Sequence, residues 1–162
     1  MPRVELYLLR HADAGDPLAW RGDDADRPLS AKGRRQARRM ARWLADLGRK
    51  PDAILTSPKA RALQTATIVA ASLAIKPQVD DRLVGPLDHE VLAALLRAAG
   101  AGSRRVMLVG HDPDFSAIAT SLSGGPVALR KGALARIDLV DGAGVAAGSL
   151  RWLVPADAVP ER

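Results

Sequence analysis

Residues 4–12 read VELYLLRHA, a mostly apolar run that leads into an arginine and a histidine. A run of this kind is typical of a β-strand that is buried on both faces of a sheet. Arg10 and His11 stand where that strand is expected to end. An arginine beside a histidine suits a site that holds an anion and then attacks it.

Further strands are predicted later in the chain. Residues 106–111 read VMLVGH, an apolar strand that ends in His111. Residues 53–61 read AILTSPKAR, a strand that leads into a helix with Arg61 in its first turn. Residues 133–140 and 148–154 flank Asp141-Gly142 and predict an antiparallel hairpin.

Helices are expected between these strands, because good N-cap residues precede each helical segment. The expected N-caps are Ser30, Ser57, Asp88 and Asp112, two of which are followed by proline. The predicted helices cover residues 30–47, 57–73, 88–98 and 112–122. On the first helix one apolar face is expected to carry Ala37, Met40, Ala41, Leu44 and Leu47.

The remaining segments are predicted to be irregular. Residues 12–28 are rich in Asp, Gly and Pro, and a loop of that length in a compact domain is usually functional. Residues 77–84 are expected to be extended or irregular, and residues 155–162 to form a frayed C-terminal tail. Because we see no repeat or linker, we expect a single domain over residues 1–154.

Strands that alternate with helices predict an α/β fold, a three-layer α/β/α sandwich whose sheet is mainly parallel with an antiparallel C-terminal hairpin. In such sheets ligands bind beyond the carboxyl ends of the strands. The fold class therefore brings Arg10, His11, Arg61 and His111 toward one edge.

Two arginines and two histidines attract an anion, and the fork of arginine matches the oxygens of a phosphoryl group. The helices that follow Pro58 and Pro113 would add free N–H groups. A neutral imidazole can attack phosphorus to form a covalent phosphohistidine. Nearby positive charge is expected to lower the pKa of that imidazole and keep it neutral.

The motifs Leu9-Arg10-His11-Ala12, Ser57-Pro58-Lys59-Ala60-Arg61 and Leu108-Val109-Gly110-His111 resemble the histidine phosphatase superfamily, whose fold is phosphoglycerate mutase-like. The short chain and the element Arg27-Pro28-Leu29-Ser30-x-x-Gly33 resemble the SixA-type phosphohistidine phosphatases. The resemblance implies that His11 is the nucleophile and that Arg10, Arg61 and His111 complete the phosphate pocket. It also implies that Arg27 lies near this pocket, and it implies no cofactor.

The sequence departs from the family pattern at two positions. The usual glycine after Arg-His is Ala12, which would be strained if its φ were positive. Residues 80–86 lack the glutamate that many members use as a general acid. Asp112 is the candidate proton donor, but an aspartate before a proline is also a good N-cap, and we favour the cap.

The composition sets limits on partners and location. The 162 residues, 48% of them hydrophobic, suffice for one buried core. The absence of cysteine excludes disulfides and thiolate sites. No segment reaches the roughly 18 apolar residues of a membrane span, and no signal peptide pattern is seen. We expect a cytoplasmic protein without a membrane partner.

The net charge of +6 favours acidic partners. Its basic residues concentrate on the first helix at Arg34, Arg35, Arg38, Arg39 and Arg42. We favour a solvated helix face, with a docking surface for an acidic protein as the alternative. Nucleic acid is not expected, because interleaved aromatic residues are absent.

The sequence thus predicts a metal-independent phosphatase that acts on a phosphohistidine protein or a small phosphate ester, with phosphate or sulfate fitting its pocket. The alternatives are a small-molecule phosphomonoesterase and a non-catalytic phospho-binding adaptor. A metal site built from Asp13, Asp16, Asp112 and the two histidines is disfavoured, because Arg10 and Arg61 would repel the ion.

Overall fold

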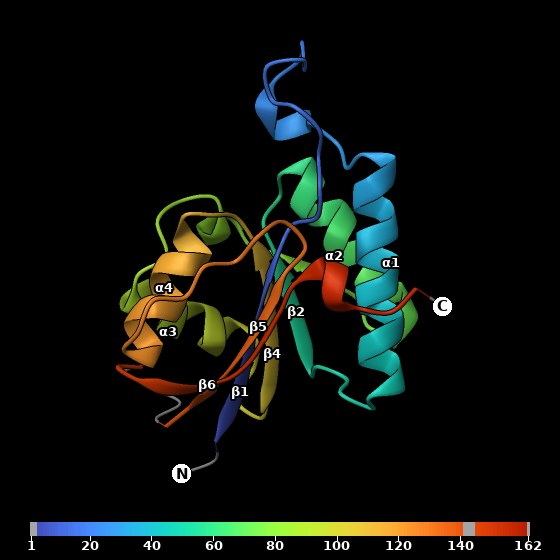
Figure 1. The fold of residues 1–162 in the computed structure, drawn as a ribbon. Coiled ribbons are helices and arrows are strands. Elements are labelled where there is room, and N and C mark those ends of the chain that lie inside the picture. Colours follow the sequence, from blue (N-terminus) through green and yellow to red (C-terminus); the bar gives the residue numbers. More distant parts are fainter. Residues whose placement is uncertain (1–2, 141–144, 162) are drawn as a thin grey trace.

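A six-stranded sheet with the order β3-β2-β4-β1-β5-β6 forms the centre of the fold (Figure 1). The computed structural model describes residues 3–140 and 145–161. Strands β1 to β4 run parallel to one another, and β5 and β6 are antiparallel. The strands are β1 Val4–Arg10, β2 Ala53–Thr56, β3 Gln78–Val79, β4 Arg105–Gly110, β5 Leu134–Leu139 and β6 Gly148–Val154. The predicted hairpin strands are confirmed, while its turn at Asp141-Gly142 lies outside the described residues.

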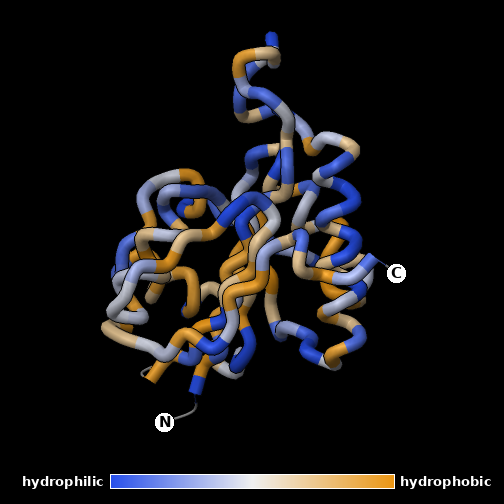
Figure 2. The backbone as a smooth tube through the Cα atoms, viewed as in Figure 1, coloured by the Kyte–Doolittle hydropathy of each residue, from blue (hydrophilic) through white to orange (hydrophobic). Residues whose placement is uncertain are grey.

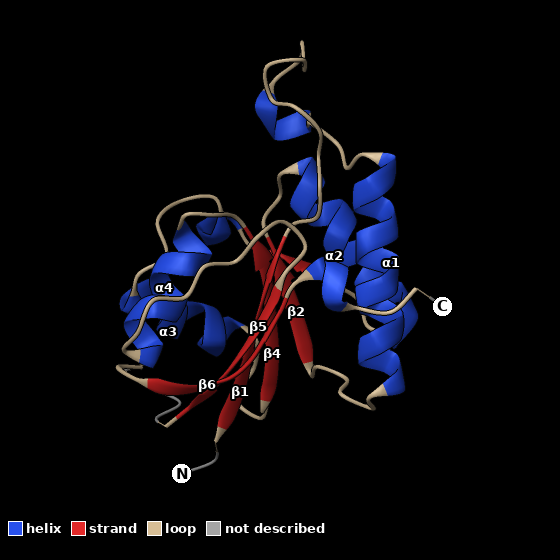
Figure 3. Cartoon of the chain, viewed as in Figure 1, coloured by secondary structure: helices blue, strands red, loops and turns tan. Residues whose placement is uncertain are grey.

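Helices cover both faces of the sheet, which confirms the three-layer α/β/α sandwich (Figure 3). One layer holds α1 Ala31–Asp46 and α2 Ala60–Leu73; the other holds α3 His89–Ala98 and α4 Asp114–Ser123. Three short 3₁₀ helices are η1 Asp24–Asp26, η2 Asp81–Leu83 and η3 Ala156–Ala158. None of the helices within residues 3–140 and 145–161 is long and apolar enough to span a bilayer.

Strand β1 contributes side chains to two separate cores. Leu6 and Leu8 pack in a cluster with residues of α3 and α4, whereas Tyr7 and Leu9 pack with residues of α1 and α2. Successive side chains of a strand point to opposite faces, so a strand covered on both sides needs an apolar run. Figure 2 shows this as a hydrophobic sheet at the centre of the molecule.

Two helices begin later than predicted. Helix α2 starts at Ala60 and its N-cap, Lys59, makes no side-chain cap, so the prediction that Ser57 caps it was wrong. Helix α4 starts at Asp114, yet Asp112 Oδ1 still accepts a hydrogen bond from Ser116 N at 3.0 Å. Asp112 was expected to be the N-cap itself. It instead caps the helix from the position before the N-cap, which is Pro113. The predicted caps Ser30 and Asp88 are confirmed.

Two other predictions of local structure were wrong. The segment 155–161 is not frayed, because Ala156 and Val159 are buried against the rest of the molecule. Leu47 is 44% exposed, since α1 ends at Asp46 and its apolar face ends with it. The segment 77–84, expected to be extended or irregular, does contain extended residues, because residues 78–79 form a short parallel strand beside β2.

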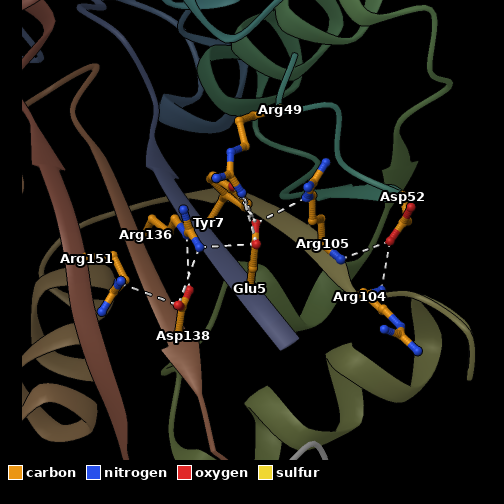
Figure 4. A network of polar contacts seen from close by, with 9 residues as sticks. All are labelled: Glu5, Tyr7, Arg49, Asp52, Arg104, Arg105, Arg136, Asp138 and Arg151. Carbon is orange, nitrogen blue, oxygen red and sulfur yellow. Dashed lines mark hydrogen bonds and ion pairs between the residues drawn. The ribbon is translucent and has the colours of Figure 1, made fainter. Parts of the chain in front are cut away.

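A charged cluster joins the strands at the amino-terminal end of β1 (Figure 4). Glu5 forms ion pairs of 3.0–3.1 Å with Arg49, Arg105 and Arg136, and it accepts a hydrogen bond from the hydroxyl of Tyr7 at 2.8 Å. These partners lie on β1, β4, β5 and the segment after α1. One carboxylate therefore holds together strands whose other ends carry the predicted site residues.

Candidate active site

Three residues follow directly after neighbouring strands, and two of them are held to the sheet by backbone hydrogen bonds. His11, Ser57 and His111 stand one residue beyond β1, β2 and β4. His11 N donates to Gly110 O at 2.9 Å, and Ser57 N donates to Val109 O at 3.0 Å. Since the three strands are parallel, their ends meet at one edge, as the sequence predicted.

His11 is oriented by its own backbone. Its Nδ1 donates to the carbonyl oxygen of Ala12 at 2.8 Å, because a carbonyl can only accept. This contact leaves Nε2 as the nitrogen with a free lone pair. Burial, opposed by that hydrogen bond and reinforced by the charges of Arg61, Arg10 and Arg27, lowers the pKa of His11 to about 4. The ring is therefore a neutral nucleophile near pH 7.

His111 lies beside His11, with ring centroids 5.3 Å apart. Its Nε2 forms a 2.8 Å hydrogen bond with Ser57 Oγ. When the Ser57 hydroxyl donates this bond, Nδ1 carries the proton of the neutral ring. Burial, the neighbouring His11 and the charge of Arg61 lower the pKa of His111 to about 3. His111 can thus offer a neutral N–H donor at Nδ1.

Within the described part of the chain, three buried side-chain nitrogens have no hydrogen-bond partner: Arg10 Nε, Arg61 Nε and His111 Nδ1. Buried donors without partners are rare, because each costs about 1–3 kcal/mol. All three belong to residues that the sequence assigned to an anion pocket. Each of the three can donate to an anion when Nδ1 is the protonated nitrogen of His111.

One terminal nitrogen of Arg10 and both terminal nitrogens of Arg61 are fixed by the protein. Arg10 Nη1 donates to Leu129 O at 2.8 Å, and Arg61 Nη1 and Nη2 donate to Asp24 O and Oδ2 at 2.8 and 3.0 Å. Each guanidinium is therefore held from one side while its Nε stays available. This is the arrangement that a preorganised anion site requires.

Arg27 is buried next to these residues, and its hydrogen bonds are to other residues of the protein. Its Nη1 donates to Ala14 O at 2.9 Å and its Nε donates to Asp24 Oδ1 at 3.1 Å. Arg27 and Arg61 thus share the carboxylate of Asp24. These contacts tie the 12–28 loop to the pocket wall, and a direct contact of Arg27 with phosphate stays a prediction.

Asp112 accepts hydrogen bonds on both oxygens. Ser116 Oγ contacts Oδ1 at 2.9 Å and Oδ2 at 2.7 Å, and the same hydroxyl accepts a bond from Leu129 N at 2.9 Å. The Leu129 carbonyl in turn holds Arg10. Asp112 also lies 3.7 Å from Arg10 Nη1. The contacts support the cap that we favoured and connect Asp112 to the position of Arg10.

The departure at Ala12 causes no strain. Among the described residues, Ala74 is the only one other than glycine with a positive φ, so Ala12 does not need the freedom of glycine. Ala12 is fully buried, and its N–H donates to Thr65 Oγ1 at 3.2 Å.

The acidic residues of the predicted metal alternative make local contacts instead. Asp13 Oδ2 accepts from Ser30 Oγ at 2.6 Å, and Asp16 Oδ1 accepts from Leu18 N at 2.9 Å. Among residues 3–140 and 145–161, no three His, Asp or Glu side chains come together in a way that could hold a metal ion.

The sequence is similar to those of known proteins. A profile of the histidine phosphatase superfamily (branch 1) matches residues 6–84. The phosphohistidine phosphatase SixA of Escherichia coli is 30% identical over 113 residues, which cover 68% of either chain. The chain belongs to the histidine phosphatase superfamily.

Two further comparisons extend the similarity to nearly the whole chain. An uncharacterized protein of Picosynechococcus sp. is 39% identical over 168 residues, which cover 94% of this chain and 100% of that protein. The solved structure of the protein histidine phosphatase SixA complexed with tungstate matches with a TM-score of 0.83 at 26% identity. That match covers 97% of this chain and 100% of the SixA chain. Relatives within this superfamily are phosphatases, and this domain has their fold.

Two side chains of the candidate active site were not predicted from the sequence. Ser57 was interpreted as a helix cap, yet its hydroxyl contacts His111. Asp24 lies in the 12–28 loop, where no periodicity singles out one aspartate among several. The composition of that loop could only indicate that it was functional, not which residue reaches Arg61.

Proposed function

We propose that this protein is a cytoplasmic, metal-independent phosphatase that hydrolyses protein phosphohistidine through a covalent phosphohistidine on His11. The observation that carries the proposal is the set of three buried, unpartnered donors, Arg10 Nε, Arg61 Nε and His111 Nδ1. They belong to the residues around a neutral His11 whose Nδ1 is already bonded. A phosphoryl group supplies the oxygens that these donors lack.

In the first step the lone pair on His11 Nε2 attacks phosphorus. The bond from phosphorus to the substrate nitrogen breaks, and its electron pair stays on the leaving imidazole, which takes up a proton. The negative charge on the phosphoryl oxygens is stabilised by Arg10, Arg61 and His111. Because Nδ1 of His11 donates to Ala12 O, the positive charge that forms on the ring is also stabilised.

In the second step a water molecule attacks the phosphorus of the phosphorylated enzyme. The bond from phosphorus to Nε2 breaks, its electrons return to His11, and the water proton leaves with inorganic phosphate or solvent. The same donors hold the oxygens in both steps, so the pocket need not rearrange between them.

The preference for phosphohistidine follows from the leaving group. An imidazole leaves phosphorus with less help from an acid than an alkoxide does. The candidate acid Asp112 has both oxygens bonded to Ser116, and residues 80–86 contain no glutamate. The SixA relatives named above are described as acting on phosphohistidine, which supports the same substrate class.

The test is a substrate screen with the wild-type protein and the His11→Ala variant. A phosphohistidine protein, a sugar phosphate and p-nitrophenyl phosphate are compared, each with and without a metal chelator. We expect fastest turnover of phosphohistidine, no effect of the chelator, and loss of turnover and of the covalent adduct in His11→Ala. Faster turnover of the sugar phosphate would favour the phosphomonoesterase, and binding without turnover in both proteins would favour the adaptor.

A further inference from the structure

A cavity of about 380 Å³ lies next to the proposed phosphate pocket. Arg10 lines this cavity and also supplies one of the three unpartnered donors. The other lining residues come from the loop after β1, the first half of α1, the segment before β5 and the segment around η3: Asp13, Lys32, Gln36, Arg130, Lys131, Pro155, Ala156 and Asp157.

The walls of this cavity are built on the backbone that carries the nucleophile. Gly132 N donates to His11 O at 3.0 Å, and Arg10 N donates to Ala133 O at 3.1 Å. Asp13 N donates to Gln36 Oε1 at 2.9 Å. The cavity is therefore held at a fixed position relative to His11.

The charge of the cavity is positive. Four cationic side chains line it against two carboxylates, and Asp13 is already engaged by Lys131 at 3.6 Å and by Ser30 Oγ. In the described part of the chain, neither Lys32 nor Arg130 forms an ion pair. The charge of Lys32 also acts on Asp13, whose pKa it helps to lower, so this one carboxylate serves two of the cations. The four cations therefore still outnumber the two carboxylates, and this excess favours an anionic guest.

We propose that this cavity binds the carboxylate of an aspartate or glutamate that flanks the phosphohistidine of a substrate protein. The inference rests on the proposed function and adds a determinant of substrate choice. Arg10 would then lie between the phosphoryl group and the flanking carboxylate. Lys32 and Arg130 are specificity residues in this arrangement and take no part in the chemistry.

The test uses two synthetic peptides that each carry one phosphohistidine and differ only in the residues beside it. One peptide has aspartates at these positions and the other has asparagines. The value of kcat/KM is measured for wild type, Lys32→Gln, Arg130→Gln and Arg35→Gln. Arg35 lies on the same helix as Lys32, is exposed and does not line the cavity, so its variant controls for net charge.

We expect wild type to prefer the aspartate peptide. The ratio of kcat/KM for the aspartate peptide to kcat/KM for the asparagine peptide should fall about two- to fivefold in Lys32→Gln. It should fall by a similar factor in Arg130→Gln. This is the range expected for exposed ion pairs. Arg35→Gln should keep the wild-type ratio. Equal use of both peptides by wild type, or an equal fall of the ratio in Arg35→Gln, would overturn the inference.

The failure of the inference differs from the failure of the proposed function. If both peptides are hydrolysed at the same rate, only the acidic subsite is refuted. If p-nitrophenyl phosphate is hydrolysed and neither peptide is, the phosphohistidine activity is refuted and the subsite with it.

Discussion

Asp24 holds Arg61 at two points: its carbonyl oxygen accepts from Nη1 at 2.8 Å and its carboxylate accepts from Nη2 at 3.0 Å. The carboxylate also accepts from Arg27 Nε at 3.1 Å. With both terminal nitrogens engaged, Arg61 keeps Nε for another partner. An exposed loop residue therefore sets the direction of a buried donor.

Replacing Asp24 by alanine should lower kcat/KM about ten- to a hundredfold, because a misplaced guanidinium loses alignment with the phosphoryl oxygens. Asp24→Asn should keep part of the activity, since an amide oxygen can still accept from Nη2. Asp26→Ala is the matched control, because Asp26 lies in the same 3₁₀ turn and is exposed. Equal losses in Asp24→Ala and Asp26→Ala would indicate damage to the loop rather than to Arg61.

The role of Asp112 can be separated from that of a general acid by changing the leaving group. If Asp112 acts by positioning Arg10 through Ser116 and Leu129, Asp112→Asn and Ser116→Ala should each lower kcat/KM by a similar factor for p-nitrophenyl phosphate and for an alkyl phosphate. If Asp112 is a proton donor, the loss of kcat/KM in Asp112→Asn should be larger for the alkyl phosphate, by about 10²- to 10⁴-fold. The kcat/KM of Ser116→Ala should then stay close to the wild-type value.

The stability of the protein should fall as the pH drops from about 6.5 toward 4. The pKa of His11 is lowered from 6.5 to about 4 and that of His111 from 6.5 to about 3. Between these values and 6.5 the unfolded chain binds protons that the folded chain does not, so acid favours unfolding. The loss should be on the order of 2 kcal/mol per histidine.

Urea unfolding at pH 7 and pH 4.5 measures this loss. The double variant His11→Gln, His111→Gln should show a smaller decrease in the unfolding free energy over the same interval. An identical decrease in the variant would place the acid sensitivity elsewhere in the molecule.

Gly33 allows the first turn of α1 to pack against the loop that follows the nucleophile. A Cβ at Gly33 would lie 1.9 Å from the carbonyl oxygen of Asp13, so the backbone of one of them must move. Gly33→Ala should lower the unfolding free energy by about 1–3 kcal/mol and also reduce turnover. Gly102→Ala is the control, because nothing lies within 4 Å of its Cβ. Unchanged melting and turnover in Gly33→Ala would contradict this account.

Much of the fold could be predicted because strands buried on both faces have a simple signature. The run that ends at Leu9 is apolar apart from Glu5 and leads into Arg10 and His11, and the run that ends at Val109 is apolar and leads through Gly110 to His111. The parallel arrangement then determines that His11 and His111 meet. The α/β sandwich and its C-terminal hairpin are confirmed, while the chemical roles of the site residues remain the subject of the experiments above.

The errors share a physical cause, which is that short segments carry too little pattern. A serine before a proline suits a helix cap equally well whether or not its hydroxyl contacts a histidine, so Ser57 was misassigned. The segment around η3 has too few residues to show a period, and Val159 was therefore not expected in the core. Tertiary contacts decide such positions, and a single sequence does not record them.

The backbone bond from His11 N to Gly110 O has a consequence for the motions of the molecule. An amide inside the central sheet exchanges its hydrogen only when the sheet itself opens, whereas exposed loop amides exchange through small local fluctuations. Residues 15–22 are exposed and project beyond the sheet and helices (Figure 1). The amide hydrogen of His11, one residue beyond β1 but bonded to β4, should thus exchange more slowly than the amide hydrogens of residues 15–22.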